Sequence, residues 1–122
     1  MNRLPKRYDI VWISAEPHSG REIGGHDSKH QSRPLLVLSK DQYNQSGFVV
    51  GMGITSHNHV KNPVLRKMMI HIISTDKSKI HGFIIPFQIP CWDYLSRNGR
   101  IVDHISNKSI LRKVNYYLHN II

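Results

Sequence analysis

The sequence predicts a mainly β fold, a small β-barrel with one α-helix at its C-terminal end. Short apolar runs rich in β-branched residues recur along the chain, each bounded by Gly, Pro or Asn, and this pattern is typical of buried strands. The last segment, Lys108–Ile121, instead repeats its apolar residues at the 3.6-residue spacing of a helix. Because a closed barrel leaves no unpaired sheet edge, it is the arrangement we expect for five or six such strands.

The first strand is expected at Tyr8–Ser14, YDIVWIS, after a short basic lead-in at residues 1–7. Its aromatic and β-branched residues suit a buried strand. Of two alternatives for Asp9, a turn residue or a polar anchor at the start of the strand, we expect the turn residue. The polar stretch Glu16–Ser32 has three glycines, three histidines and almost nothing to bury, so it predicts a long loop that is functional or disordered.

The centre of the chain predicts a hairpin. Two apolar runs, Leu35–Leu38 and Phe48–Ile54, are separated by a turn-rich segment at residues 41–47. In an antiparallel hairpin, the start of the first strand and the end of the second strand lie at the same end. We therefore expect Arg33 and Thr55 to be neighbours. A guanidinium beside a hydroxyl at the rim of a sheet is suited to bind a phosphate.

The later segments are less regular. Met68–Ile73 could form a strand or a short helix, and its shortness favours a strand. Gly82–Ile89 predicts a strand in which Pro86 requires an edge position or a bulge. The C-terminal helix is expected to begin with Ser106 or Ser109 as its cap. The remaining segments are a turn, a loop and a strand, expected at Ser74–Lys79, Pro90–Asn98 and Gly99–Ile105 respectively.

The composition bounds the possible functions. With 122 residues the chain can bury one core but not two, so we expect a single domain spanning residues 1–122. A formal net charge of +9 predicts a polyanionic partner such as nucleic acid. No apolar run is long enough for a membrane helix, and no signal peptide is recognised. Cys91 is the single cysteine, which excludes an internal disulfide and suits the cytoplasm.

Two histidine pairs have spacings that superficially resemble metal sites. One is His26 with His30, and the other is His57 with His59. Neither pair belongs to a closed set of zinc ligands, so we expect no metal and no cofactor. Both pairs are instead expected to face solvent or phosphate.

Several segments, taken in order, resemble one known family. They are YDIVWI, GREIGG, RPLLVLS, YN, SGFVVGMGITS and GRIVDHI. No single segment is specific, but their joint order and spacing resemble the MazF/PemK (Kid) family, the toxin endoribonucleases of type II toxin–antitoxin modules. The resemblance is strong over residues 8–57 and weaker, but collinear, toward the C-terminus.

The resemblance implies an SH3-like small β-barrel, usually a homodimer, that cleaves single-stranded RNA at short sequences without a metal. The two recurrent active-site positions of the family match Arg33 and Thr55, which are our expected catalytic residues. It also implies a cognate acidic antitoxin as a partner. The substrate-binding residues that we expect come from the family's loop, from the hydroxyl and histidine residues near Thr55, and from a late acidic position: Arg21, Glu22, His26, Ser56, His57 and Asp103.

Metal-free RNA cleavage uses the ribose 2′-hydroxyl as nucleophile on the adjacent phosphate. Arg33 can supply the positive charge that this phosphate needs, and Thr55 can donate a hydrogen bond to it. The group that transfers protons is left open among His26, His57 and Asp103. An alternative function is a non-catalytic module on the same barrel that binds nucleic acid or a protein, including a toxin that poisons gyrase.

Overall fold

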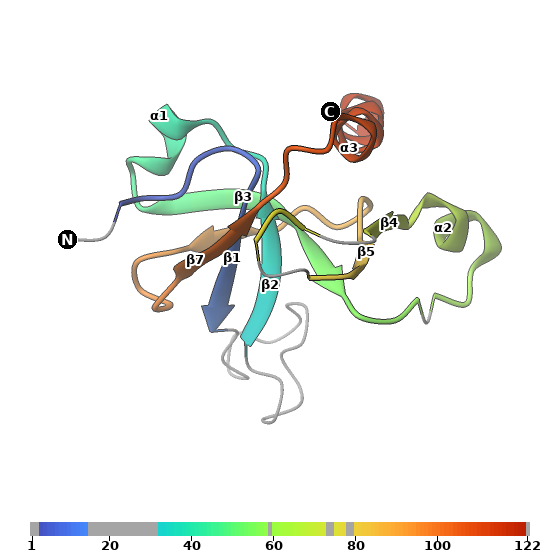
Figure 1. Ribbon diagram of the computed structural model, residues 1–122, viewed down its shortest axis with the longest axis horizontal. Helices are drawn as coiled ribbons and strands as arrows, with labels where there is room; N and C mark the ends of the chain where they lie inside the picture. Colours follow the sequence, from blue (N-terminus) through green and yellow to red (C-terminus); the bar gives the residue numbers. More distant parts are fainter. Residues whose placement is uncertain (1–2, 15–31, 59, 73–74, 78–79, 122) are drawn as a thin grey trace.

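A curled antiparallel sheet with a helix on one side forms the body of the computed structural model (Figure 1). The structure describes residues 3–14, 32–58, 60–72, 75–77 and 80–121. Within these ranges, six strands follow one another in the order β4-β5-β3-β2-β1-β7, and β6 pairs with β3 beside this path. The sheet curls into a half-barrel, which confirms the predicted mainly β class with a C-terminal helix. The elements are β1 Asp9–Ser14, β2 Ser32–Val37, α1 Asp41–Asn44, β3 Phe48–Thr55, α2 Pro63–Met68, β4 Ile70–Ile72, β5 Gly82–Ile84, β6 Cys91–Asp93, β7 Arg100–His104 and α3 Lys108–Ile121.

The three central strands bury both of their faces. Ile10, Leu36 and Met52 lie opposite one another across β1, β2 and β3 and belong to one apolar cluster. Their neighbours Val11 and Leu35 belong to a second cluster on the other face, together with Trp92 of β6. Apolar residues on both faces explain why these strands appear in the sequence as unbroken apolar runs.

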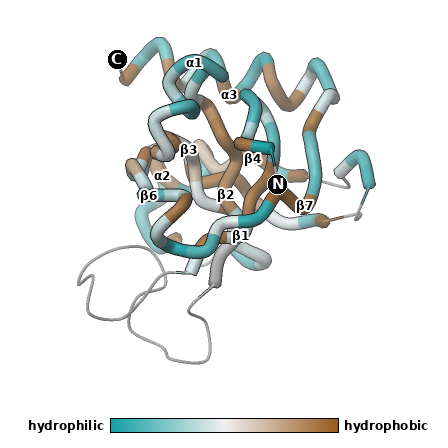
Figure 2. The backbone as a smooth tube through the Cα atoms, turned by 90° about the vertical axis from the view of Figure 1, so that its left-hand side faces the viewer, coloured by the Kyte–Doolittle hydropathy of each residue, from teal (hydrophilic) through white to brown (hydrophobic). Residues whose placement is uncertain are grey.

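Helix α3 packs against the first cluster, as its apolar stripe predicts. Val114 is fully buried there, and Leu111 and Leu118 pack beside it. In Figure 2 short hydrophobic and hydrophilic stretches alternate along the tube of this helix, as expected for a helix with one buried face. The cap expected at Ser106 or Ser109 is wrong, because the side chain of Asn107 accepts the hydrogen bond from Ile110 N–H at 3.1 Å.

Helix α2 replaces part of a predicted strand. We expected Met68–Ile73 to be a strand, but the helix runs to Met68 and only β4 is extended. Asn62 caps this helix by accepting hydrogen bonds from Val64 N–H and Leu65 N–H, and Pro63 occupies the first turn. A side-chain cap followed by proline is a strong helix start, and it outweighs the short apolar run that follows.

Two other expected boundaries were wrong. The predicted strand Gly82–Ile89 ends at Ile84, two residues before Pro86, which cannot donate a ladder hydrogen bond. The segment Pro90–Asn98, expected to be a loop, contains β6, which pairs with the first residues of β3. Trp92 of β6 is buried in the second cluster, so its side chain holds this short strand against the sheet.

Asp9 is a buried anchor and not a turn residue. Its carboxylate accepts hydrogen bonds from Lys6 N–H at 2.9 Å and from the Arg3 guanidinium at 2.8 Å, and it lies 2.8 Å from His104 Nδ1. Burial alone raises the pKa of Asp9, but these hydrogen bonds outweigh burial and lower the pKa below its ordinary value. The carboxylate therefore links the N-terminal segment to both β1 and β7.

Asp103 performs a similar role on the neighbouring strand, β7, where it lies opposite Ile10. Its buried carboxylate accepts hydrogen bonds from the hydroxyl of Thr75 and from Lys77 N–H, the latter at 2.8 Å. The Asp76 N–H donates to the His104 carbonyl at 3.3 Å. These contacts bring the segment after β4 onto β7, so they draw the two ends of the strand path together.

Replacing Asp9 with Asn should lower the free energy of unfolding by about 2 kcal/mol near neutral pH, because a buried carboxylate that accepts several hydrogen bonds is lost. Since the pKa of Asp9 is lower in the folded state, its stabilisation is present above a pH of about 4 and is lost as the pH falls through the folded-state pKa. Denaturant unfolding of wild type and Asp9→Asn at several pH values tests this. The exposed Asp76→Asn is the control, and a stability difference that does not shrink in acid would contradict it.

Candidate active site

Four strand ends converge at one rim of the sheet. The antiparallel pairings of β1 with β2, β2 with β3, and β1 with β7 set the C-terminal ends of β1 and β3 beside the N-terminal ends of β2 and β7. Figure 1 shows the arrowhead of β1 next to the start of β2. We call this end of the sheet the rim, and it comprises Ser14, Arg33, Thr55 and Arg100 with the residues that directly adjoin them. The rim lies at the opposite end of β1 from Asp9.

Arg33 and Thr55 are at corresponding positions on β2 and β3. The pairing of these strands runs from Val37 with Gly51 to Leu35 with Gly53. Arg33 and Thr55 are each two residues beyond this last pair, in the same direction. Both residues therefore belong to the same end of the hairpin, as its pattern predicted, although the pairing of β2 with β3 stops at Leu35 and Gly53 and Thr55 pairs with β5 instead. Arg33 is held on its other side by pairing with Ile13 of β1.

The chain turns back on itself directly after Thr55. The Thr55 hydroxyl donates a hydrogen bond to the His57 carbonyl at 3.3 Å, and Ser56 Oγ lies 2.9 Å from His57 Nδ1. Thr55 is half-buried, whereas Ser56 and His57 are exposed. The turn thus presents two hydroxyls and an imidazole to solvent at the rim. An imidazole held by a hydroxyl is a suitable group for proton transfer.

Gly82 allows β5 to pack closely behind this turn. The residue has a φ of +150°, and a Cβ at this position would collide with the Thr55 carbonyl oxygen and lie 3.3 Å from Ser56 Cα. Thr55 pairs with Phe83, the next residue of β5. Glycine is therefore needed here for both its backbone angle and its lack of a side chain.

Arg97 is a rim residue that the sequence pattern did not reveal. Its guanidinium donates to the Ser14 carbonyl at 3.1 Å and lies 4.9 Å above the Trp92 ring. Hydrogen bonds from Ser96 N–H and hydroxyl, followed by the nearby Arg97 charge, lower the pKa of Asp93. The signal in the sequence was weak, because Arg97 lies in a segment expected to be a loop. It adds a fixed positive charge at the end of β1.

Asp103, another expected site residue, does not lie at the rim. Arg21, Glu22 and His26 lie outside the described residues. Asp103 is three positions from Arg100 along β7, and its carboxylate is bonded to the segment after β4. Within residues 3–14, 32–58, 60–72, 75–77 and 80–121, no three His, Cys, Asp or Glu side chains are grouped as metal ligands.

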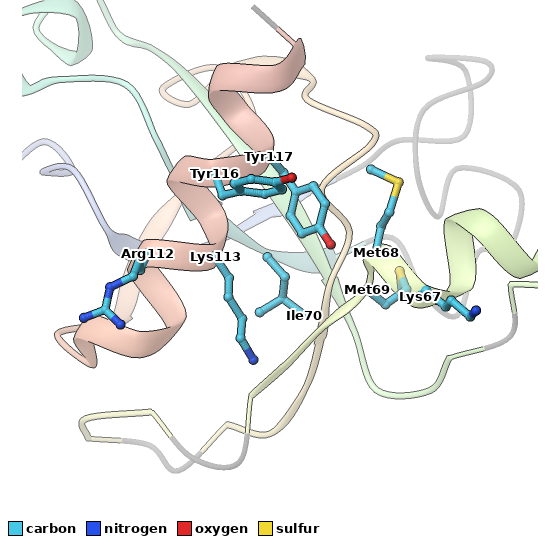
Figure 3. Close-up of a pocket in the computed structure, with 8 residues that line it drawn as sticks. All are labelled: Lys67, Met68, Met69, Ile70, Arg112, Lys113, Tyr116 and Tyr117. Atoms are coloured by element: carbon cyan, nitrogen blue, oxygen red, sulfur yellow. The ribbon is translucent and has the colours of Figure 1, made fainter.

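A pocket of about 380 Å³ lies away from this rim, between α3 and the segment that joins α2 to β4 (Figure 3). Tyr116 and Tyr117 of α3 point toward the methionines of the facing segment. Three cations and no acid are among its lining residues, so it would attract an anion rather than a cation. The lining residues are Lys67, Met68, Met69, Ile70, Arg112, Lys113, Tyr116 and Tyr117.

The fold and the rim together define a class of small, basic half-barrel protein in which a central hairpin brings an arginine and a threonine to one end. Residues 6–122 match the family described as PemK-like, MazF-like toxin of type II toxin–antitoxin system. The chain therefore belongs to this toxin family, as its sequence motifs predicted. None of the helices in the described ranges is long and apolar enough to cross a membrane.

Relatives of known structure or activity agree with this assignment. The endoribonuclease toxin ChpB of Escherichia coli (strain K12) is 26% identical over 111 residues, which cover 88% of this chain and 89% of ChpB. MazF of Deinococcus radiodurans is 21% identical with a TM-score of 0.72, and the match covers 98% of this chain and 97% of that chain. An endoribonuclease in complex with its cognate antitoxin from a mycobacterial species is 16% identical with a TM-score of 0.64, covering 98% and 93%. The fold is thus MazF-like.

Replacing Gly82 with Ala should destabilise the protein by about 1–3 kcal/mol and displace the Thr55–Ser56 backbone, because the new methyl group meets the Thr55 carbonyl. Thermal unfolding gives the stability, and amide NMR shifts report on Thr55 and Ser56. Ser56→Ala is the control, since it changes the same turn without adding a clash. Unchanged Thr55 and Ser56 amide shifts in Gly82→Ala would contradict the close packing of β5.

Proposed function

We propose that this toxin is an endoribonuclease that cleaves single-stranded RNA, including mRNA, at specific sequences and without a metal ion. The observation that supports the proposal is the register of β2 and β3, which puts Arg33 and Thr55 at the same end of the central hairpin, each two residues beyond the last pair of Leu35 with Gly53. Two further facts support it: the net charge of +9, and the similarity to a relative that is an endoribonuclease toxin. A positively charged surface attracts the RNA backbone.

In the proposed reaction, the ribose 2′-oxygen attacks its own 3′-phosphate. A bond forms between the 2′-oxygen and phosphorus, and the bond from phosphorus to the 5′-oxygen of the next nucleotide breaks. The products are a 2′,3′-cyclic phosphate and a free 5′-hydroxyl. The guanidinium of Arg33 neutralises the charge that develops on the phosphate, and the Thr55 hydroxyl donates a hydrogen bond to it.

The proton-transfer role is best assigned to His57 among the three expected candidates. Its imidazole is exposed, directly follows Thr55 and is held at 2.9 Å by Ser56. Asp103 is buried and already accepts hydrogen bonds from Thr75 and Lys77. His57 takes the proton from the 2′-hydroxyl or gives one to the leaving 5′-oxygen, because an imidazole nitrogen can accept or donate a proton.

The remaining expected residues would hold the RNA strand. Ser56 adjoins the phosphate site, and Arg21, Glu22 and His26 belong to the sequence between β1 and β2, which leaves and re-enters the sheet at the rim. Contact of Asp103 with RNA stays a prediction.

The protein partners that we propose are a second copy of this chain and an acidic antitoxin. A chain with seventeen Lys and Arg against eight acids favours a negatively charged inhibitor that competes with RNA for the basic surface. The structural relative from a mycobacterial species is itself in complex with its cognate antitoxin.

Arg33→Ala and Thr55→Val should each lower the rate of RNA cleavage by about 100-fold or more, since each removes a group that stabilises charge in the transition state. The assay follows cleavage of single-stranded RNA with chelator present, and mass spectrometry identifies the cyclic phosphate. Arg112→Ala on α3 and Thr55→Ser are controls that should retain activity. If wild type binds RNA but shows no cleavage that depends on Arg33, the chain is a binding module and not a nuclease.

His57→Ala should lower the single-turnover cleavage rate by about 100-fold or more while RNA affinity changes little, because proton transfer contributes to the transition state and not to binding. Added imidazole should restore part of the rate. The exposed His81→Ala is a matched control of the same residue type. Full activity of His57→Ala would remove His57 from the mechanism and return the role to His26 or Asp103.

A further inference from the structure

A row of three side chains leads from Thr55 across the sheet to its edge. Thr55 of β3 pairs with Phe83 of β5, and Phe83 pairs with His71 of β4. Residues that are directly opposite in antiparallel strands share one face of the sheet. The strand spacing of about 4.8 Å puts His71 about 10 Å from Thr55 along this row. Figure 1 shows β4, β5 and α2 together on the side where β3 ends.

The two rings in this row are stacked on each other. The ring centroids of His71 and Phe83 are 4.9 Å apart, and the ring planes differ by 24°. The row on the opposite face consists of Ile54, Ile84 and Ile70, which are all buried in the core. His71, in contrast, is exposed, and Phe83 is half-buried. The core therefore fixes the backbone of both residues while their rings form a platform on the outer face.

Positive charge lies beside this platform. A single residue, Met69, separates helix α2 from β4, and the helix carries the exposed side chain of Arg66. Asn58, just after the Thr55 turn, donates a hydrogen bond to the Arg66 carbonyl at 3.4 Å, so this helix is tied to the turn that follows Thr55. Aromatic rings for bases combined with cations for the backbone are the usual means of holding single-stranded nucleic acid.

We infer that the His71–Phe83 ring pair is a stacking site for an RNA base of a nucleotide that neighbours the cleaved one. This inference rests on the proposed nuclease function, in which the cleaved phosphate is bound at Thr55. The strand continues from the phosphate along the row, and one base extends the stack on the ring pair. The backbone of the same stretch runs beside Arg66. The site holds the RNA in position and adds a preference for bases that stack well.

The test measures binding of a short single-stranded RNA that wild type cleaves, made with a 2′-O-methyl group at the cleaved nucleotide so that it stays intact. His71→Ala should weaken binding about tenfold, as expected for the loss of one stacking partner. His71→Tyr should retain the affinity because it keeps an aromatic ring, whereas His71→Gln should not. Phe83→Leu, which preserves apolar volume, should weaken binding to a similar extent.

An abasic scan of the same RNA separates stacking from general charge. Removing the base at the stacked position should weaken binding to wild type but should have little further effect on His71→Ala. His119→Ala on α3 is the matched control for losing an exposed histidine. Equal RNA affinity of wild type and His71→Ala would overturn the stacking site while leaving the nuclease proposal intact. The same conclusion would follow if the losses of affinity caused by His71→Ala and by base removal were additive at every abasic position. A wild-type protein that neither cleaves nor binds RNA would overturn both.

Discussion

The pairing of β1, β2 and β3 is the constraint on which the rest of the molecule depends. Their residues alternate between two buried apolar clusters. A shift of one residue in the pairing would move every side chain of a strand into the cluster on the opposite face. Burial of both faces therefore fixes the register, and the register fixes which residues reach the rim. The placement of Arg33 and Thr55 at the same end of the hairpin is a consequence of core packing.

The two ends of the half-barrel are organised differently. At one end, the buried carboxylates of Asp9 and Asp103 accept hydrogen bonds from segments that would otherwise be loosely attached, and these contacts connect the strand edges. At the other end, hydroxyl groups, an imidazole and the cation of Arg97 lie close to solvent. Buried hydrogen bonds make one end of the sheet rigid, and polar and charged groups lie at the other end. Such an arrangement is suited to hold a substrate in a fixed geometry.

The central hairpin and the C-terminal helix could be predicted because each depends on a local pattern. Unbroken apolar runs signalled strands buried on both faces, and the stripe from Ile110 to Leu118 signalled a helix packed on one side. Helix α2 and strand β6 were missed, because they are short and depend on a cap at Asn62 and on the burial of Trp92. The resemblance to toxin endoribonucleases predicted Arg33 and Thr55 as site residues, and the hairpin register puts both at one end of the sheet.

The sequence by itself determined the mainly β class, the toxin family, the basic character and the hairpin that puts Arg33 and Thr55 at the same end, since all of these follow from composition, local periodicity or ordered motifs. The tertiary structure alone decided that Asp9 and Asp103 are buried anchors, that Arg97 joins the rim, and that His71 and Phe83 stack in line with Thr55. These arrangements join residues from different strands and turns, and such distant pairings leave no periodic trace in a single chain.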